Sequence, residues 1–391
     1  MKKTFKFRLY SNRDQKELLG QTLETCRILY NNALAERRVA WKKEKRSVGY
    51  HEQAVALPFQ KASDPYLPQV HSQVLQDVLK RVDKTYQNYF RRLELYRQGK
   101  GEKPGYPRYK GYYRYDSFTY PQSGFKIEGK KLVLSKIGSV DIKLHRPIEG
   151  TVKTCTIRRD VDRWYACFTV ELPDVAAEKR GIANAVGVDV GLSSLVTLST
   201  GEKIEPPKFL RKIEEKLARE QRRLSRKKKG SKNRLKQRLK VAKLHRKIRE
   251  QRTDFNHKLS RKLVDTYDLI AFEDLRIRNM LQNHHLAKSI SESSWYMLQG
   301  LTAYKAGEAG KQMALVDPNG TSQECSNCGE KVGKNLSVRM HECPYCGLVL
   351  DRDVNAAINI LKRAVGEGLA DLMPVGGLPL GTPLKQEAIP L

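Results

Sequence analysis

Two Cys-x-x-Cys pairs near the C-terminus constrain the fold of this chain more than any other feature. The pairs are Cys325/Cys328 and Cys343/Cys346. The 14 residues between them, 329–342, are an ordinary length for a zinc ribbon, and a glycine follows each pair, where the turn needs a positive φ. Four thiolates close a tetrahedral site, so we expect structural Zn²⁺, with redox chemistry at one pair as the weaker alternative.

The charge of the chain indicates the class of partner. Lys and Arg number 74 against 43 Asp and Glu, which gives a formal net charge of +31. Such an excess favours a polyanion, because each cation placed on a phosphate releases condensed counterions. The opening residues, MKKTFKFRLY, alternate as a strand does and do not resemble a signal peptide. No run of 18 apolar residues occurs, so we expect no membrane span.

Three more cysteines, Cys26, Cys155 and Cys167, are scattered among apolar residues. We expect them to be inert thiols of the core. A chain with one paired set and three isolated thiols suits a reducing cytoplasm.

The N-terminal half predicts a small β-barrel interrupted by a helical insertion. A strand at about 3–10 is followed, much later, by short alternating runs from 117 to 172, which are typical of strands joined by tight turns. We therefore expect a barrel built from residues 1–10 and 100–175, with residues 11–99 inserted into it. The fold class is then α+β and multidomain.

Two helices are predicted within the insertion. The first begins at Asn12 or Asp14 and places leucines at helical spacing. The second covers about residues 71–98. Between them we expect a linker that contains three prolines, Pro58, Pro65 and Pro68.

The C-terminal half begins after a boundary near 173–185. We expect an α/β domain from residues 180–316 and 350–365, with the ribbon, 317–349, inserted. Its predicted elements are a buried strand hairpin at 185–202, a strand in TYDLIAFEDL, a helix around 285–310 and a strand in KQMALVDP. The tail, 366–391, is rich in Gly, Pro and Leu without periodicity and is expected to be disordered.

A basic helical hairpin is predicted at 206–265, turning at Gly230. Residues 211–250 contain 19 Lys or Arg and 4 Asp or Glu. A solvated surface helix is the simplest interpretation of a charge run. Here an apolar stripe underlies the charge and favours a packed helix pair with a phosphate-facing side. The stripe consists of Ile213, Leu217, Leu224, Leu235, Leu239 and Ala242.

Two carboxylates stand in apolar sequence. Asp189 lies in AVGVDVGL and Glu273 in LIAFEDL, and both stretches predict buried strands. A buried carboxylate is unfavourable unless it pairs or coordinates a cation. A single such acid would ordinarily pair with an arginine or cap a strand. Two of them, with a third acid after the ribbon, favour a shared metal site, for which oxygen ligands select Mg²⁺ or Mn²⁺.

The third acid is either Asp351 or Asp353. Asp351 has the position of an N-cap for the last helix. Asp353 shares a helix face with Ala357 and Ile360, the stripe that should pack on the sheet, so we assign Asp353 as the ligand. Asp274 alternates to the opposite face from Glu273 and is expected to be a supporting or surface residue.

Three carboxylates that hold Mg²⁺ on a mixed sheet would hydrolyse phosphodiesters. The order of strands, helices and acids is that of an RNase H-like fold. Residues 185–363 resemble the RuvC-type nuclease of the transposon-encoded TnpB (OrfB) family, which is related to compact type V CRISPR effectors. The matching motifs are GVDVGL, HRKIREQRTDFNHKLS, IAFEDL, NHHLAKSISESSW, DPNGTSQECSNCG and CPYCGLVLDRDVNAAINIL.

The N-terminal half resembles the family more loosely, through the opening strand, residues 71–90 and the loop KPGYPRYKG. His341 departs from the family, in which an aromatic residue is common before the second Cys pair. Because four thiolates already close the site, we expect His341 to pack within the ribbon.

The resemblance implies an RNA-guided DNA endonuclease. A guide RNA from the transposon end would pair with double-stranded target DNA beside a short motif. Asp189, Glu273 and Asp353 would be the acidic triad, the barrel a wedge domain and the inserted helices a recognition lobe. A transposase encoded by the same element is a further expected partner, and the location would be cytoplasmic and nucleoid-associated in a prokaryote. The alternatives are a guide-directed repressor that does not cut and a transposase.

Three groups of residues are candidates for nucleic-acid contact. Gln73, Gln76 and Lys80 lie on the polar side of the second helix and could reach a duplex, although a solvated face is an equal alternative. Tyr106, Arg108 and Lys110 belong to a loop in which tyrosines alternate with cations. The hairpin offers phosphate contacts without sequence specificity at Arg222, Arg223, Arg226, Lys227 and Lys228.

Overall fold

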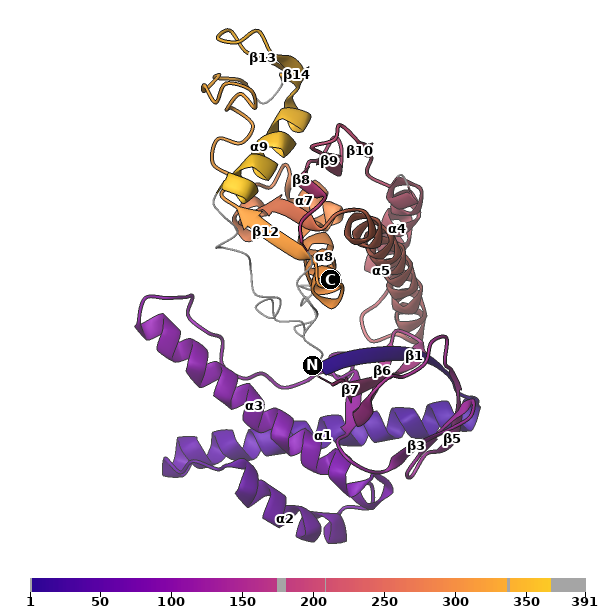
Figure 1. The fold of residues 1–391 in the computed structure, drawn as a ribbon. Helices are drawn as coiled ribbons and strands as arrows, with labels where there is room; N and C mark the ends of the chain where they lie inside the picture. Colours follow the sequence, from indigo (N-terminus) through magenta and orange to yellow (C-terminus); the bar gives the residue numbers. More distant parts are fainter. Residues whose placement is uncertain (1, 174–180, 208, 336–337, 367–391) are drawn as a thin grey trace. The chain divides into compact units, whose positions relative to one another are not determined.

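A computed structural model describes residues 2–173, 181–207, 209–335 and 338–366 (Figure 1). The chain divides into two compact units, Met1–Asp174 and Val175–Leu391, which are called unit 1 and unit 2 below. Each unit has its own sheet and its own core. The predicted tail lies outside the described residues, apart from Gly366.

Unit 1 contains a seven-stranded antiparallel sheet in the order β2-β6-β7-β1-β5-β4-β3. The N-terminal strand lies in the middle of this sheet, where Phe5 is opposite Phe168 of β7. Burial alternates along β7, as a sheet with one covered face requires. The strands are β1 (Lys2–Tyr10), β2 (Ser117–Tyr120), β3 (Phe125–Glu128), β4 (Lys131–Leu134), β5 (Gly138–Lys143), β6 (Thr151–Asp160) and β7 (Arg163–Glu171).

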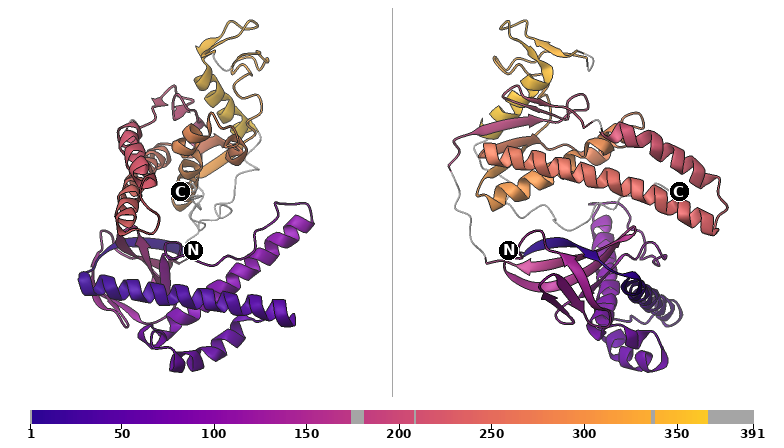
Figure 2. Two further views of the ribbon diagram at one scale, coloured as in Figure 1. Left: turned by 180° about the vertical axis from the view of Figure 1, so that it is seen from behind. Right: turned by 90° about the vertical axis from the view of Figure 1, so that its right-hand side faces the viewer.

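The helices of unit 1 are α1 (Arg13–Glu44), α2 (Tyr50–Ser63) and α3 (Ser72–Arg97), with a short 3₁₀ turn, Leu67–Gln69. Asn12 caps α1 through a capping box with Gln15. The covered face of the sheet packs on α1 and α3 in one apolar core (Figure 2). Burial raises the pKa of the Cys26 thiol to about 12 and that of the Cys155 thiol well above its usual value, which keeps both protonated and inert.

The predicted proline linker is wrong in its first part, because α2 continues through Pro58. Long-range hydrogen bonds hold this helix against α1. The Gln53 amide donates to the Ala33 carbonyl at 2.9 Å and accepts from Arg37 Nε at 2.9 Å. Gln53 and Leu57 are the buried residues of α2. Tertiary contacts therefore override the unfavourable effect of a proline inside a helix.

Unit 2 contains a five-stranded mixed sheet in the order β10-β9-β8-β11-β12. Strands β8, β11 and β12 are parallel, and β9 is antiparallel to β8. Parallel strands covered on both faces are apolar along their length, as β11 is. The strands are β8 (Ala185–Asp189), β9 (Val196–Leu198), β10 (Lys203–Ile204), β11 (Leu269–Glu273) and β12 (Gln312–Val316).

Helices cover both faces of this sheet. Alternate residues, including Val186 and Ile270, pack with α5 (Lys232–Thr266) and α8 (Trp295–Glu308). The residues between them, including Leu269 and Ala271, pack with α9 (Arg352–Gly366). The remaining helices of the unit are α4 (Phe209–Ser225), α6 (Ile277–Met280) and α7 (Ala287–Ser293).

The structure differs from two sequence expectations in these helices. The helix predicted around 285–310 is broken at Ser294, whose φ of 53° lies in the left-handed region. In the hairpin of α4 and α5, which lie side by side in both views of Figure 2, Leu235 and Leu239 are exposed. The buried positions of this part of α5 are Gln237 and Val241, because Gln237 donates to Glu220 of α4.

The ribbon contains a two-stranded sheet of β13 (Met340–Glu342) and β14 (Val349–Asp351). It is followed directly by α9, whose first residue is Arg352. Among the described residues, no helix has both the length and the apolar character that a membrane crossing requires.

Candidate metal centres

The sheet register places two of the predicted acids on one face. Asp189 ends β8 and Glu273 ends the neighbouring parallel strand β11. Side chains alternate along a strand, so Asp189 shares the face of Gly187, and Glu273 shares the face of Ala271. That face is the one covered by α9. Both carboxylates therefore lie at the carboxyl ends of their strands, beneath the first turn of α9.

A close approach of backbone to backbone brings the third acid there. A Cβ atom at Gly187 would lie 1.9 Å from the Ala357 carbonyl oxygen of α9, so only glycine permits this packing. Asp353 lies in the first turn of α9. Burial, then the charges of Glu273 and Asp353, raise the pKa of Asp189 to about 8. The charges of Glu273 and Asp353 are therefore close enough to disfavour ionisation of Asp189.

Asp351 and Asp353 have different surroundings. The Asp351 carboxylate accepts hydrogen bonds from the N–H groups of Asp353 and Val354, at 3.0 and 3.2 Å, and pairs with Lys203. It is the cap that the sequence predicts. The Asp353 carboxylate lies 3.4 Å from Arg352 and 4.0 Å from Arg339. Its side chain is 15% exposed, against 29% for Asp351.

Glu273 is held by residues that the sequence analysis missed. Its side chain accepts a hydrogen bond from Thr321 Oγ1 at 2.5 Å, and its backbone carbonyl accepts one from Gln299 at 3.0 Å. Burial raises the pKa of Glu273, while the Thr321 hydrogen bond opposes that shift. Asp274, in contrast, is exposed.

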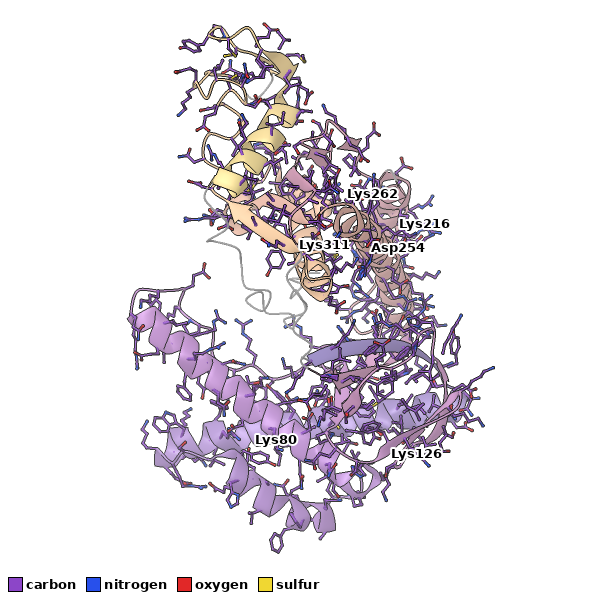
Figure 3. The ribbon with its side chains drawn as sticks, in the orientation of Figure 1. Lys80, Lys126, Lys216, Asp254, Lys262 and Lys311 are labelled. Carbon is purple, nitrogen blue, oxygen red and sulfur yellow. The ribbon has the colours of Figure 1, made fainter. Side chains whose placement is uncertain are left out.

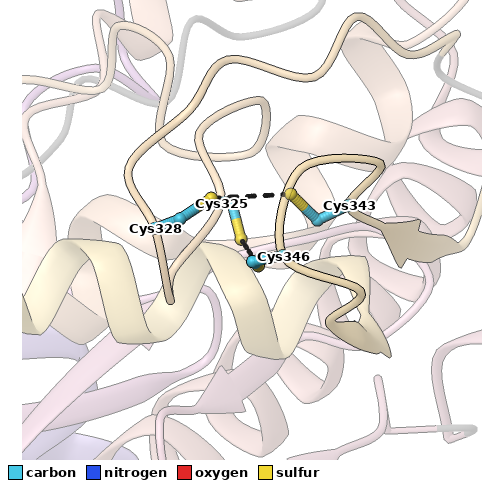
Figure 4. Close-up of side chains that lie close together, drawn as sticks. All are labelled: Cys325, Cys328, Cys343 and Cys346. Carbon is cyan, nitrogen blue, oxygen red and sulfur yellow. Dashed lines mark hydrogen bonds between the residues drawn. The ribbon is translucent and has the colours of Figure 1, made fainter.

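The four cysteines form the predicted cluster, as Figure 4 shows. Their sulfur atoms all lie within 4.8 Å of one another, and the Cys325–Cys346 and Cys328–Cys343 pairs are each 3.6 Å apart. A tetrahedron with Zn–S bonds of about 2.3 Å has edges of about 3.8 Å. The cluster therefore fits Zn²⁺.

The carboxylates are spread more widely than the thiols. Within the described parts of the chain, only the cysteines bring three or more potential ligand atoms within 4.8 Å of one another. His341 is not among them; it is fully buried in the ribbon, with its Nδ1 beside Lys334 Nζ. This placement agrees with a packing role for His341.

Helix α9 also clamps the ribbon through two asparagines. Asn355 and Asn359 are buried, at 0% and 6% exposure, and both donate to the Glu324 carbonyl at 2.8 Å. Asn355 further accepts from the N–H of Ser326, between the cysteines of the first pair, at 2.9 Å. In the sequence these residues are two asparagines four positions apart, which share one face of the last helix.

Of the three candidate nucleic-acid contacts on the polar side of α3, one is hydrogen-bonded within the protein and two are exposed. Gln73 Oε1 accepts hydrogen bonds from the backbone and side chain of Ser123, both at 3.0 Å. Gln76 and Lys80 are exposed, and Lys80 is labelled on α3 in Figure 3. The Lys80 ammonium lies 5.6 Å from the centre of the Tyr50 ring.

The loop 100–111 is fastened to α1 although it contains no helix or strand. Asn31 binds both backbone groups of Lys110: it donates to the carbonyl at 3.0 Å and accepts from the N–H at 2.8 Å. Arg38 donates to the Pro107 carbonyl at 2.8 Å. Asn31 and Arg38 are seven residues apart, two helical turns on one face of α1, so the helix orders the loop backbone.

The side chains of this loop divide between packing and exposure. Arg38 lies over the rings of Tyr106 and Tyr109, at 4.9 and 4.8 Å from their centres. Both tyrosines and Arg108 remain exposed. Further along, Tyr115 is 5% exposed and belongs to the core.

The basic hairpin carries its candidate cations on the surface. Arg222, Arg226 and Lys228 are exposed, and Lys227 is partly buried. Arg223 pairs with Glu220 at 2.8 Å and is therefore only partly available to a phosphate.

These features define a mixed α+β multidomain protein with a four-cysteine cluster that fits Zn²⁺ and with acids at the carboxyl ends of two parallel strands. Three family models match it. One described as "Probable transposase" (OrfB of IS605) matches residues 167–284, and "Cas12f1-like, TNB domain" matches 295–360. A third, "Helix-turn-helix domain", matches 1–46, where the structure has β1 and a single helix, α1.

Two relatives cover nearly the whole chain. A protein of Streptomyces pristinaespiralis named "Putative RNA-guided DNA endonuclease" is 38% identical over 94% of this chain and 92% of its own. InsQ of Escherichia coli K12, which carries the same description, is 32% identical over 98% of this chain and 96% of its own. The chain belongs to the TnpB (OrfB) family of IS605-type elements, which is related to Cas12f.

Among solved structures, the Cas12f1 chain of a complex with sgRNA and target DNA is similar to this chain. The identity is 16% over 92% of this chain and 99% of the other, with a TM-score of 0.35.

Proposed function

We propose that this chain is an RNA-guided DNA endonuclease of a transposable element, which cleaves double-stranded DNA beside a short motif by metal-dependent hydrolysis. The observation that carries the proposal is the convergence of Asp189, Glu273 and Asp353 from β8, β11 and α9 on one face of the sheet. The family and the printed descriptions of two near full-length relatives support the RNA-guided activity.

We assign the nuclease domain to residues 180–316 and 350–365. The strand order β10-β9-β8-β11-β12, in which only β9 runs opposite to the other strands, supports an RNase H-like (RuvC-type) fold. The ribbon, 317–349, interrupts this domain. In unit 1 we assign residues 1–10 and 100–175 to a barrel-type wedge and residues 11–99 to a recognition lobe.

The three carboxylates would hold Mg²⁺ or Mn²⁺. They fit such an ion because they are oxygen ligands on one face and because burial, and then the charges of Glu273 and Asp353, raise the pKa of Asp189. When bound, the ion would activate water and stabilise the leaving oxygen of a phosphodiester. The protein's own part is to fix the positions of the acids through the β8–β11 register and the docking of α9 on Gly187.

Nucleic acid would bind at three surfaces. Gln76 and Lys80 of α3, with Gln73, are proposed to contact the duplex that carries the motif. The loop with Tyr106, Arg108 and Lys110 is proposed to stack bases and follow a backbone, since α1 already orders it and exposed aromatics among cations suit single strands. The α4–α5 hairpin would contact phosphates.

A plasmid library with random bases beside a target tests the proposal. The protein would be purified with RNA transcribed from its own locus and incubated with Mg²⁺ or with EDTA, beside an Asp189→Ala control. We expect cutting that requires the RNA, the metal and Asp189, and the cut sequences would report the motif. Guide-dependent binding without cutting would instead favour a repressor, and strand joining without a guide would favour a transposase.

A further inference from the structure

The segment between β12 and the first cysteine pair contacts both candidate metal centres. It contains Thr321, which is 3% exposed and lies beside Glu273, itself 7% exposed. We propose that Thr321 is a positioning residue for the Glu273 carboxylate and that the ribbon holds it in place through Asn355 and Asn359 of α9. The inference rests on the proposed role of Glu273 as a metal ligand.

The Thr321 hydroxyl contacts the Glu273 carboxylate. A threonine hydroxyl has one hydrogen to donate, and two acceptors lie near it. Glu273 Oε1 is at 2.5 Å and the Pro318 carbonyl at 3.2 Å, so the shorter, charge-assisted bond goes to the carboxylate. This bond fixes the side-chain torsion of Glu273 and engages one of its two oxygens. The other oxygen does not share that bond.

Thr321 is itself held by α9. Its backbone carbonyl accepts a hydrogen bond from Asn359 Nδ2 at 2.9 Å. The same amide donates to the Glu324 carbonyl at 2.8 Å, so Asn359 fixes the spacing of two carbonyls three residues apart. Gly320, with a φ of +81°, closes this turn, and its carbonyl accepts from the N–H of Glu324 at 2.9 Å. Thr321 therefore cannot move without disturbing α9.

Helix α9 also links this turn to the first cysteine pair. Asn355 donates to the Glu324 carbonyl at 2.8 Å and accepts from the Ser326 N–H at 2.9 Å, so one side-chain amide binds the backbone on both sides of Cys325. Lys362 donates to the Ser326 carbonyl at 2.5 Å. Buried and part-buried hydrogen bonds thus join the first cysteine pair, α9 and Thr321, and loss of any one of them would be unfavourable.

Helix α9 therefore serves both centres, from different faces. Asn355 and Asn359 hold the ribbon, and Asp353, two residues before Asn355, is the third acid. A change in the first cysteine pair would shift α9 and the Thr321 turn together. The ribbon then has a role beyond its own folding: it sets the positions of two of the three acids.

Three substitutions at buried threonines test the assignment. Thr321→Val keeps the shape and removes the hydroxyl, and Thr321→Ser restores the hydroxyl. Thr302→Val is the matched control, because Thr302 is fully buried in unit 2 but its hydroxyl donates only to the Leu298 carbonyl of its own helix. Mn²⁺ binding to the full chain would be followed by electron paramagnetic resonance, with Asp189→Ala as the background. Zinc content and the Mg²⁺ dependence of cleavage would be measured alongside.

We expect Thr321→Val to weaken Mn²⁺ binding about 10-fold to 100-fold, the range typical of residues that orient metal ligands, at unchanged zinc content. The Mg²⁺ concentration for half-maximal cleavage should rise by a similar factor. Thr321→Ser should restore both quantities, and Thr302→Val should leave both unchanged. Wild-type Mn²⁺ affinity in Thr321→Val would overturn the assignment, and so would loss of zinc together with Mn²⁺, since Thr321 would then only stabilise the ribbon.

The link from the ribbon has its own test in Asn355→Asp, which keeps the acceptor for Ser326 and loses the donor to Glu324. We expect zinc to be retained and Mn²⁺ affinity to fall; zinc retained with wild-type Mn²⁺ affinity would overturn the link. The outcome is separable from that of the proposed function. If wild-type protein shows no guided cleavage but its Mn²⁺ binding needs both Asp189 and Thr321, positioning stands and the guided nuclease fails. If guided cleavage occurs and Thr321→Val binds Mn²⁺ normally, the reverse holds.

Discussion

The two sheets of this protein bury different kinds of side chain. In unit 1 the covered face is apolar, with Phe7, Phe118 and Phe168 all fully buried. In unit 2 the α5–α8 face is apolar, whereas the α9 face ends in carboxylates. The first sheet is stabilised by nearly everything that it buries. The second combines one stabilising face with one whose acids repel each other, so its stability and its proposed chemistry are divided between faces.

The largest expected effect concerns the acids of the second sheet. Asp353→Asn removes a proposed ligand without changing shape, and we expect cleavage to fall by about 1,000-fold or more, as when a group that stabilises the transition-state charge is lost. Guide-dependent DNA binding in EDTA should persist. Plasmid cleavage and filter binding would measure the two quantities. Cleavage at the wild-type rate would remove Asp353 from the site.

Alanine substitutions at two glycines, one in each unit, compare the packing of the two units directly. Gly187→Ala should destabilise unit 2 by about 3 kcal/mol, because the added Cβ would meet the Ala357 carbonyl and overpacking displaces α9. Gly20 lies inside α1 with nothing within 4 Å of its Cβ position, so Gly20→Ala should stabilise unit 1 by about 0.5–1 kcal/mol. Urea unfolding measures both changes. Equal effects at the two sites would contradict the close packing of β8 and α9.

The pH dependence of stability should also separate the units. The pKa of Asp189 is raised in the folded protein, to about 8, above its ordinary value of 3.8. The folded state therefore holds a proton that the unfolded state releases, and stability falls as pH rises from about 4 towards 8.

In Mg²⁺-free buffer at pH 8 we expect Asp189→Asn to be more stable than the wild type, by several kcal/mol. The difference should vanish near pH 4, where both side chains are neutral. Denaturant titrations at the two pH values measure it. A less stable variant at pH 8 would mean that the carboxylate is favourably paired in the metal-free protein.

The smallest expected effect distinguishes a cap from a ligand. Asp351→Ala removes the hydrogen bonds to the first turn of α9 and should lower stability by about 1 kcal/mol. Cleavage should remain within a few-fold of the wild type. Loss of cleavage comparable to that of Asp353→Asn would show that Asp351 takes part in the site.

The sequence was sufficient to predict features that depend on the periodicity of a single helix or strand, or on the spacing of a single motif. Two strands that each end in an acid, and a helix whose apolar stripe includes Asp353, follow from alternation and from 3.6 residues per turn. The four-cysteine cluster follows from spacing alone, and the structure confirms it. The distinction between Asp351 and Asp353 also came from helix geometry.

Long-range hydrogen bonds account for what the sequence did not predict. α2 passes through Pro58 because Gln53 joins two helices, and Leu235 and Leu239 are exposed because Gln237 takes the buried position beside Glu220. Thr321 was missed for the same reason: its partner, Glu273, is 48 positions away. A polar side chain in a loop carries no periodic signal of such a partner.

The position of α9 along the chain has a consequence for synthesis. Asp189 and Glu273 leave the ribosome well before Asp353, and the turn with Thr321 cannot be fixed until Asn355 and Asn359 have emerged. A nascent chain that has folded both sheets therefore still lacks the complete set of acids. Translation that stops before residue 353 would release a basic protein that lacks one of the three acids proposed to hold the metal ion.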